Sequence, residues 1–575
     1  MKYKQININM KPNRILLIVC YIAFSLNLMA NEIITFTWRA VSSPYGYVYY
    51  KNISITATLN KSFTVDWGDG SNIETKMGTG NKQILSHTYA DAKSYTATIT
   101  SSSDCLFTYL DCANNGITIL DVNTSVSLKT LLCNSNQLTN LSINNLIALT
   151  EIDCEYNQIS SIDVSNNSLL TKFNCSGNRI SILNVNNNTA LTSLNCYNNK
   201  ISSLDVSNNT VLKTLSCGEN LLNSLELSTN ISLTYLDCFN NNLKKLNLSV
   251  NPALEHLECS RNQLSNLVFE KNSALVYLYC WGNQLDSLDV SDNTAIEVLS
   301  CSYNMLSNLD LSNNTALLAL HCNENNLSNL NLSKNTKLRE IECRRNHLNT
   351  LDLSKHPLLF TLECGYNELN SLILNANAPF DRTLTCEYNR LRLSDLFEIS
   401  KMIGNGAYRT LSPQFIDSQY ISVNTPVDLT SQSIFNGIAT TFMVIKDGWP
   451  ASNTEYSING AIVTFKKEGN FGVMMKNEAI VSQWSEPALV FEYFTVGNVG
   501  IADITQIPDI LAYPNPTTDK VYLKTEAEII PDVKLYSSNG KLLKYLHSRE
   551  IDLSIYSAGV YILQVAEKTV KIVKN

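Results

Sequence analysis

Apolar and polar positions repeat every 21 residues through the middle of the chain. Each repeat contains a cysteine, with Leu, Ile or Phe two positions before it, Asn three after it and Ile or Leu five after it. Leu or Ile also follows eight positions after the cysteine in every repeat but the last. The cysteines are Cys112, Cys133, Cys154, Cys175, Cys196, Cys217, Cys238, Cys259, Cys280, Cys301, Cys322, Cys343 and Cys364, with Cys386 after a step of 22. Fourteen such repeats indicate a stacked array of identical units.

The repeat occupies residues 105–394, and the flanking segments lack its period. Residues 31–104 contain alternating stretches such as SITATLN and SYTATITS, and residues 415–500 contain ATTFMVIKDG and ALVFEYFTVG. β-Branched and aromatic runs bounded by turn residues predict strands. Residues 395–414 are predicted to cap the solenoid, because a terminal repeat would otherwise expose its apolar core. The stretch LSDLFEISKMIG, residues 393–404, predicts a helix there. A chain of 575 residues is long enough for several domains.

The repeat pattern, L-x-x-L-x-C-x-x-N-x-L-x-x-L, resembles the leucine-rich repeats. It is most similar to the short bacterial ones, with an LDVSNNT-like return stretch in place of a convex helix. The resemblance implies a mostly β fold, a leucine-rich repeat solenoid of 14 rungs with a 21-residue period, flanked by β-sandwich domains. It specifies little about function, because the scaffold serves many partners.

In such a solenoid the cysteines form an inward-pointing ladder. Parallel strands lie about 4.8 Å apart, which exceeds the Cβ separation of about 3.8 Å that a disulfide requires. We therefore expect buried free thiols that act as small apolar groups. A metal site is disfavoured because the ladder has no histidine partners. Two roles are open for Cys105: it could pair with Cys112, or it could be a capping residue.

The asparagine three positions after each cysteine forms a second ladder. The backbone must turn at the end of each strand, which leaves N–H and C=O groups facing the core. An inward Asn side chain can satisfy both kinds of group. Substitution of Asn241 or Asn262 is therefore expected to reduce stability.

The flanking segments resemble known families. VDWGDGS and SHTYADAKSYTATIT in residues 31–104 resemble a PKD-type β-sandwich, and residues 415–500 have the strand spacing of an immunoglobulin-like β domain. Residues 501–510 serve as a linker. Residues 511–575, with Pro514-Asn515-Pro516, an Asn539-Gly540 turn and SAGVYIL, resemble the C-terminal sorting domain of the type IX secretion system of Bacteroidetes. The resemblance implies passage across the outer membrane with the help of the type IX machinery.

Residues 1–30 are predicted to be a signal peptide. Basic residues precede the apolar run ILLIVCYIAFSLNLMA, which is too short for a confident membrane span. A lipoprotein signal at Cys20 is disfavoured, because no small residues lead up to it. We expect a secreted or outer-membrane surface protein. The net charge of −8 argues against a nucleic-acid partner.

Catalytic motifs are not found in the sequence. It contains no H-E-x-x-H, G-x-S-x-G or Walker pattern. Asp66 and Asp69 could form a carboxylate pair or part of a calcium site, but turn positions explain them as well. We predict no enzymatic activity, no catalytic residues, no cofactor and no metal.

The outward-facing strand positions are the candidate binding surface. They lie three and one before the cysteine and one and two after it, on the concave face. Aromatic residues gather there in three successive rungs. Acidic residues recur elsewhere on the same face and include Glu340, Glu342 and Glu363. The predicted ligand-binding residues are Tyr235, Asp237, Phe239, His256, Glu258, Tyr277, Tyr279, Trp281 and Tyr303.

Exposed aromatic residues on neighbouring strands suit a protein ligand, host or bacterial, held by a few anchors. The alternative is a glycan-binding protein of a polysaccharide-utilisation system, because Tyr and Trp also stack on sugar rings. A purely structural explanation also exists, since cross-strand aromatic pairs stabilise sheets.

Overall fold

A computed structural model describes residues 31–39, 49–91, 93–269, 271–404, 406–482 and 486–497. In the C-terminal domain it describes 510–513, 520–525, 533–537, 542–546, 550–554, 556–565 and 568–574. The signal-peptide prediction for residues 1–30 and most of the predicted linker lie outside these ranges. Within them, no helix is long and apolar enough to span a membrane.

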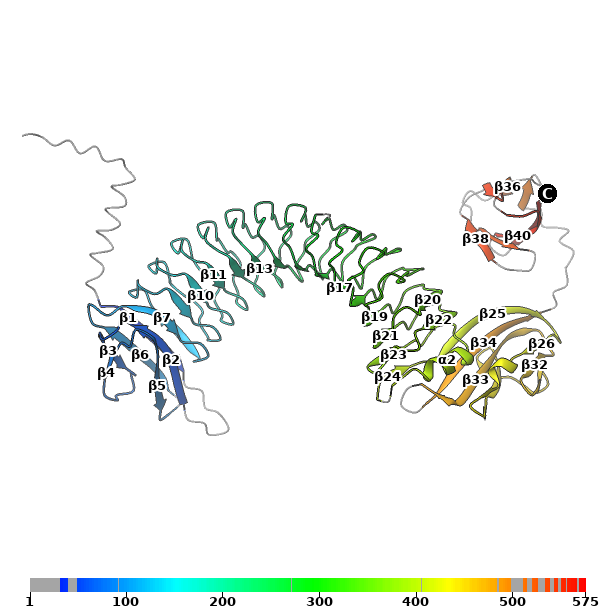
Figure 1. Ribbon diagram of the computed structural model, residues 1–575, viewed down its shortest axis with the longest axis horizontal. Coiled ribbons are helices and arrows are strands. Elements are labelled where there is room, and N and C mark those ends of the chain that lie inside the picture. The colour runs from blue at the N-terminus through cyan, green and yellow to red at the C-terminus, as the bar shows by residue number, and fades with distance from the viewer. Residues whose placement is uncertain are drawn as a thin grey trace, which may run out of the picture.

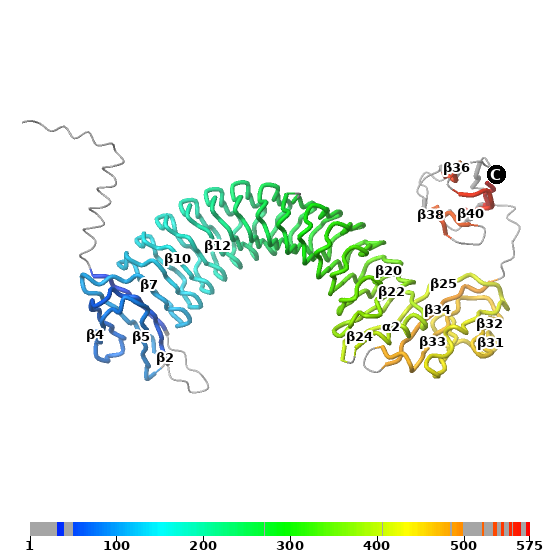
Figure 2. The backbone as a smooth tube through the Cα atoms, in the orientation of Figure 1, coloured from blue at the N-terminus to red at the C-terminus, as the bar shows by residue number. Residues whose placement is uncertain are grey.

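The repeats form an arched solenoid with its short parallel strands on the concave side (Figures 1 and 2). Each strand pairs in register with the strand 21 residues away, so equivalent positions align in columns. The strands are β7 (Phe107–Asp111), β9 (Thr130–Leu132), β10 (Glu151–Asp153), β11 (Lys172–Asn174), β12 (Ser193–Asn195), β13 (Thr214–Ser216), β14 (Tyr235–Asp237), β15 (His256–Glu258), β16 (Tyr277–Tyr279), β17 (Val298–Ser300), β18 (Ala319–His321), β19 (Glu340–Glu342), β21 (Thr361–Glu363), β23 (Thr383–Thr385) and β24 (Tyr408–Thr410). The predicted fold class, a mostly β solenoid of fourteen rungs, is confirmed.

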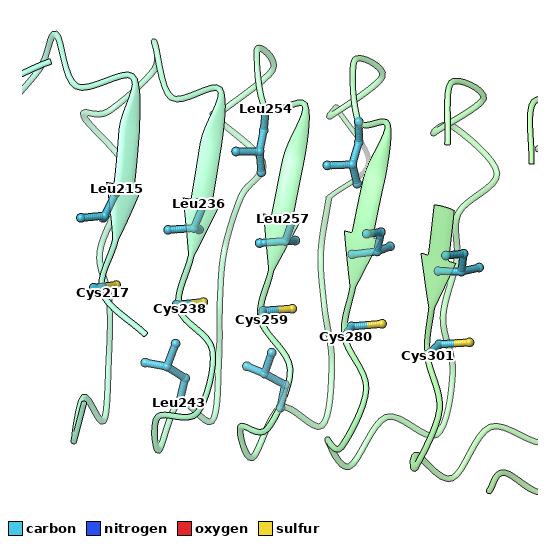
Figure 3. Close-up of a cluster of buried hydrophobic side chains, with 14 of the residues drawn as sticks. Leu215, Cys217, Leu236, Cys238, Leu243, Leu254, Leu257, Cys259, Cys280 and Cys301 are labelled. Atoms are coloured by element: carbon cyan, nitrogen blue, oxygen red, sulfur yellow. The ribbon is translucent and has the colours of Figure 1, made fainter. Parts of the chain in front are cut away.

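The cysteines lie inside the solenoid, beside the column of leucines at the middle of the strands, such as Leu215, Leu236 and Leu257. Figure 3 shows Cys217, Cys238, Cys259, Cys280 and Cys301 projecting in the same direction from successive rungs. All described cysteines, including Cys105, are buried and carry free thiols. Burial raises the pKa of each ladder thiol, to about 12 for Cys196. The ladder is therefore a packing element, as the strand spacing predicts.

The predicted asparagine ladder links each rung to the one before it. Asn241 Nδ2 donates to the carbonyl oxygens of Cys217 at 3.0 Å and Cys238 at 3.2 Å, and its Oδ1 accepts from the Leu222 N–H at 2.9 Å. One side chain thus satisfies three buried backbone groups, which would otherwise each cost free energy.

A second asparagine ladder runs along the return side of nine rungs, from Asn167 to Asn335, thirteen positions after the cysteine of each. Asn209 is fully buried there, and its Nδ2 donates to the carbonyl oxygens of Val185 at 3.1 Å and Asn188 at 2.8 Å. His356 occupies the equivalent place in a later rung, with Nε2 3.2 Å from the Leu332 carbonyl oxygen. The sequence analysis did not identify this ladder.

The N-terminal segment forms a β-sandwich joined to the solenoid. One sheet has the order β4-β3-β6-β1-β8. The other has the order β5-β2-β7, and β7 pairs with β9, so it continues into the concave sheet. The first repeat therefore supplies a strand to each sheet. The remaining bounds are β1 (Ile33–Arg39), β2 (Tyr49–Ala57), β3 (Ser62–Asp66), β4 (Glu74–Met77), β5 (Lys82–Tyr89), β6 (Ser94–Ser101) and β8 (Ile117–Asp121). Its resemblance to a PKD domain stays a prediction.

In this domain Trp67 is buried, and the neighbouring aspartates shape a turn. Asp66 accepts from the Gly68 N–H at 2.9 Å, and Asp69 accepts from the Ser71 N–H at 3.0 Å. Asp69 also lies 2.7 Å from His87 Nε2. Both aspartates therefore have structural partners.

The other end of the solenoid is covered by helix α2 (Leu393–Ser400), which buries Leu393, Leu396 and Ile399. The next domain contains a sheet of order β25-β34-β33-β29-β30 and a smaller one of order β26-β32-β31. Two return-side strands, β20 (Thr350–Leu353) and β22 (Ser371–Leu374), precede it. The other bounds are β25 (Gln414–Ser422), β26 (Pro426–Asp428), the 3-10 helix η1 (Thr430–Gln432), β27 (Ile434–Phe435), β28 (Ile438–Ala439), β29 (Thr441–Lys446), β30 (Trp449–Pro450), β31 (Tyr456–Asn459), β32 (Ile462–Phe465), β33 (Gly469–Val481) and β34 (Pro487–Gly497).

The C-terminal domain has its own core, formed by buried residues such as Val521, Leu535 and Leu563. Its sheets have the orders β35-β36-β39 and β38-β37-β40-β41. The bounds are β35 (Ile510–Tyr513), β36 (Lys520–Thr525), β37 (Val533–Ser537), β38 (Leu542–Leu546), β39 (Glu550–Asp552), β40 (Gly559–Val565) and β41 (Lys568–Lys574). A second continuous core, by contrast, extends from the N-terminal sandwich through the solenoid to β34.

Candidate functional site on the concave face

Eight of the nine predicted ligand-binding residues lie on or directly after β14, β15 and β16. We call the nine residues Tyr235, Asp237, Phe239, His256, Glu258, Tyr277, Tyr279, Trp281 and Tyr303 the central cluster. Tyr303 follows the next strand and is 57% exposed in a left-handed conformation with φ of 55°. Among the described residues, the Tyr303 ring makes no ring contact with the other eight members of the cluster.

The first column of the cluster contains Tyr235, His256 and Tyr277, which lie directly opposite one another on the three strands. The rings of Tyr235 and His256 stack with centroids 4.5 Å apart and an interplanar angle of 20°. His256 and Tyr277 are 5.7 Å apart and tilted by 40°. One face of the Tyr235 ring is therefore covered by its neighbour.

The second column contains Asp237, Glu258 and Tyr279, again in direct register. Asp237 accepts from the Phe239 N–H at 3.0 Å, and Glu258 accepts from the Ser260 N–H at 2.9 Å. Neither carboxylate has a Lys or Arg partner within 4.0 Å in the described part of the chain. Two like charges directly opposite on neighbouring strands disfavour each other.

Burial is the main cause of the altered pKa values in these two columns. It raises the pKa of Asp237 and of Glu258 above the ordinary range of a carboxyl group. It also lowers the pKa of His256, an effect that the Asp237 charge partly opposes. Burial thus disfavours the charged form of all three groups.

The third column contains Phe239 and Trp281, separated by Ser260. The two rings are 5.9 Å apart, and Ser260 is fully buried although it belongs to the concave face. The Arg261 guanidinium carbon lies 4.9 Å from the Trp281 ring centroid and 5.8 Å from that of Phe239. The sequence analysis missed Arg261, which is exposed and sits at a position after the cysteine that it treated as outward-facing.

Two arginines farther along the concave face are each paired with a glutamate. Arg344 lies 2.8 Å from Glu387, and Arg345 lies 3.0 Å from Glu324. Both guanidinium groups also lie over the ring of Tyr366. The central cluster differs from this region because its carboxylates lack such partners.

Comparisons with known proteins agree with this architecture. Residues 511–575 match the family of the secretion system C-terminal sorting domain. The functional domain of InlJ from Listeria monocytogenes, which includes a cysteine ladder, is 25% identical with a TM-score of 0.53, over 69% of this chain and 93% of that chain. No curated protein matches the chain in sequence.

Two further solved structures are less similar. A leucine-rich repeat protein of Leptospira interrogans is 20% identical with a TM-score of 0.43, over 51% of this chain and 93% of that chain. An internalin, InlF, from Listeria monocytogenes is 22% identical with a TM-score of 0.42, over 52% of this chain and 83% of that chain.

The fold and the matched C-terminal domain define the class of this protein. It is a leucine-rich-repeat-like solenoid protein that carries a type IX secretion sorting domain. It is accordingly secreted or attached to the outer-membrane surface.

Proposed function

We propose that this protein is a non-enzymatic binding and adhesion protein that recognises a protein ligand through the central cluster. The carrying observation is that charges of both signs, Asp237 and Glu258 together with Arg261, lie beside aromatic side chains on one rigid sheet and have no ion-pair partner among the described residues. Protein interfaces typically combine aromatic and Arg anchors with charged groups that select the partner.

Rigidity supports this role. The strands β14, β15 and β16 are held by in-register pairing, and the asparagine ladder fixes the turn behind each of them. A surface that is already ordered loses little conformational entropy when it binds. A few well-placed side chains can then supply most of the affinity.

The arrangement of the rings favours a protein ligand over the glycan alternative. Sugar recognition by stacking needs a free aromatic face, but Arg261 lies over Phe239 and Trp281. His256 covers a face of Tyr235 in the same way. These contacts leave fewer free ring faces for a sugar. The neighbouring charges suit the mixed side chains of a protein, and the carboxylates favour a partner with basic residues.

The test uses the secreted protein against a protein panel that spans acidic to basic isoelectric points and against a glycan array. An isosteric double variant, Asp237→Asn with Glu258→Gln, removes both charges. Glu226→Gln, on an exposed position away from the strands, is the matched control.

We expect a basic protein ligand whose affinity falls at least tenfold in the double variant and is unchanged in the control. The affinity should also fall with added salt. Binding to glycans alone would support the polysaccharide-utilisation alternative. Protein binding that the double variant leaves unchanged would contradict recognition by the central cluster.

A further inference from the structure

A second group of side chains lies on the concave face on β18 and β19, two and three strands after β16. His321 ends β18, and Glu340 and Glu342 begin and end β19. The register places Glu342 directly opposite His321, while Glu340 lies opposite the small Ala319. Two glutamates of one strand can therefore reach the imidazole of the preceding strand.

The three side chains converge on one point. His321 Nε2 lies 3.2 Å from Glu340 Oε1 and 3.9 Å from Glu342 Oε1. One potential ligand atom from each residue lies within 4.8 Å of the other two. The side chains are between 27% and 31% exposed, so they are partly shielded but reachable from the concave side.

Hydrogen bonding within this group is incomplete. A neutral imidazole has one N–H, so Nε2 can donate to only one of the two carboxylates. No Lys or Arg lies within 4.0 Å of Glu340 or Glu342 among the residues that the structure describes. The nearby Arg344 is instead paired with Glu387 at 2.8 Å. A single cation between the three side chains would satisfy all of them.

We propose that His321, Glu340 and Glu342 form a binding site for a divalent transition-metal ion, with Zn²⁺ the best fit. Zn²⁺ binds imidazole nitrogen and carboxylate oxygen at about 2.0–2.2 Å, which places tetrahedral ligand atoms roughly 3.3 Å apart. The distances from His321 Nε2 to the two carboxylate oxygens, 3.2 Å and 3.9 Å, bracket this value. Ca²⁺ is a poorer fit, because it takes six to eight oxygen ligands and does not favour imidazole.

The surroundings support this assignment. Asn323 Nδ2 donates to the second carboxylate oxygen of Glu342 at 2.8 Å, while its Oδ1 accepts from the Arg344 N–H at 2.7 Å. Such outer contacts hold a metal ligand in one orientation. Glu363 lies opposite Glu342 on the next strand, so a third carboxyl group stands beside the site.

The three proposed ligands come from two strands, with Glu342 one 21-residue period after His321. With three protein ligands, a tetrahedral ion keeps one position for water or an incoming group. The ladder cysteines do not compete for zinc in the folded protein, because they are fully buried with raised pKa values. The metal site is separate from the central cluster and does not depend on the proposed function.

The test is calorimetric titration of the EDTA-treated, dialysed full-length mature protein with Zn²⁺, Mn²⁺ and Ca²⁺. We expect one equivalent of Zn²⁺ to bind in the micromolar range or tighter, with Ca²⁺ at least tenfold weaker. His321→Ala and Glu342→Gln should each weaken Zn²⁺ binding at least tenfold. The control is His347→Ala. His347 is also paired with a glutamate, Glu368 at 3.2 Å, but no second carboxylate joins this pair among the residues that the structure describes.

Co²⁺ provides a second measurement, because its visible absorption reports a nitrogen–oxygen coordination sphere. The spectrum should appear with wild type and with His347→Ala and be lost with His321→Ala. Thermal unfolding without metal checks that each variant is folded. Failure of the wild type to bind Zn²⁺, or equal weakening by His321→Ala and His347→Ala, would overturn the proposal.

Discussion

The rings of Phe239 and Trp281 meet at a centroid distance of 5.9 Å across the rung that carries Ser260, which is fully buried. This relationship belongs to a wider alternation along the same column. A methyl group at Gly218 would lie 2.8 Å from the Tyr197 ring, so the small residue is required beside the large one. Large and small residues alternate as Glu155, Ser176, Tyr197, Gly218, Phe239, Ser260, Trp281 and Ser302. Pairs of rungs, 42 residues long, therefore build this part of the concave surface.

The asparagine ladder predicts a large difference between two adjacent asparagines. Asn325 Nδ2 donates to the carbonyl oxygens of Cys301 and Cys322, and its Oδ1 accepts from the Leu306 N–H. Asn325→Ala should lower the free energy of unfolding by roughly 3 kcal/mol, because buried backbone groups lose their partners. Asn326→Ala, at an exposed position, should change it by less than about 0.5 kcal/mol. Chemical denaturation measures both, and equal effects would contradict the structural role of the ladder.

The cysteine ladder predicts a specific thiol count. In the folded protein, a thiol reagent should react with almost none of the cysteines from Cys105 to Cys386, because all are buried. After unfolding in guanidinium without reductant, all fifteen should react. A count near zero in the unfolded protein would mean that the thiols are paired.

Asp237 should make stability depend on pH in a defined direction. Its pKa is raised in the folded state, mainly by burial, so the protonated form is the one that folding favours. That contribution is fully present below the ordinary aspartate pKa and is lost as pH rises through the folded-state pKa. Asp237→Asn should therefore raise Tm relative to wild type at pH 7.5, with the difference shrinking toward pH 3.5.

Asp289 provides a control of opposite sign. Hydrogen bonds from the Ser291 hydroxyl and N–H lower its pKa. Its contribution is present above the ordinary aspartate pKa and is lost as pH falls through the folded-state pKa. Asp289→Asn should lower Tm at pH 7.5 and have little effect in strong acid. The same sign of change in both variants would show that burial does not govern Asp237.

The sorting domain should be separable from the solenoid. Its core is distinct from the core that runs from the N-terminal sandwich to β34. Removal of residues 511–575 should leave the Tm of the remaining protein within about 2 °C, since few shared contacts are lost. In a bacterium with a type IX system, the truncated protein should be retained in the cell. Its normal appearance in the medium or at the surface would contradict the role of this domain.

Much of the solenoid could be predicted from the sequence because its period is strict. The register that aligns Tyr235 with His256, and the inward positions of Cys238 and Asn241, follow directly from 21-residue spacing. The free thiols could be predicted because neighbouring strands lie farther apart than the two Cβ atoms of a disulfide. These features depend on backbone geometry that every rung repeats.

Other features of the site depend on side-chain packing across rungs. Arg261 has a left-handed backbone conformation with φ of 51°, and its guanidinium lies over Trp281 of the next rung. The sequence shows that Arg261 occupies an outward-facing position, but not that its guanidinium turns toward the next rung. His321 and Glu342 are 21 residues apart, which places them opposite each other on neighbouring strands. Tabulating residue size and charge along each column would have found both relationships.

The measurement that tests recognition by the concave face most directly compares three proteins on the same protein and glycan panels. They are the wild type, a Tyr277→Ala, Tyr279→Ala and Trp281→Ala triple variant, and Tyr420→Ala. Tyr420 is 73% exposed on β25, outside the solenoid, and controls for the loss of an exposed aromatic side chain.

Thermal unfolding first establishes that the triple variant is folded. The account predicts that a protein ligand binds the wild type and Tyr420→Ala equally and that its affinity falls at least a hundredfold in the folded triple variant. A protein ligand that binds all three with equal affinity would contradict recognition by the central cluster.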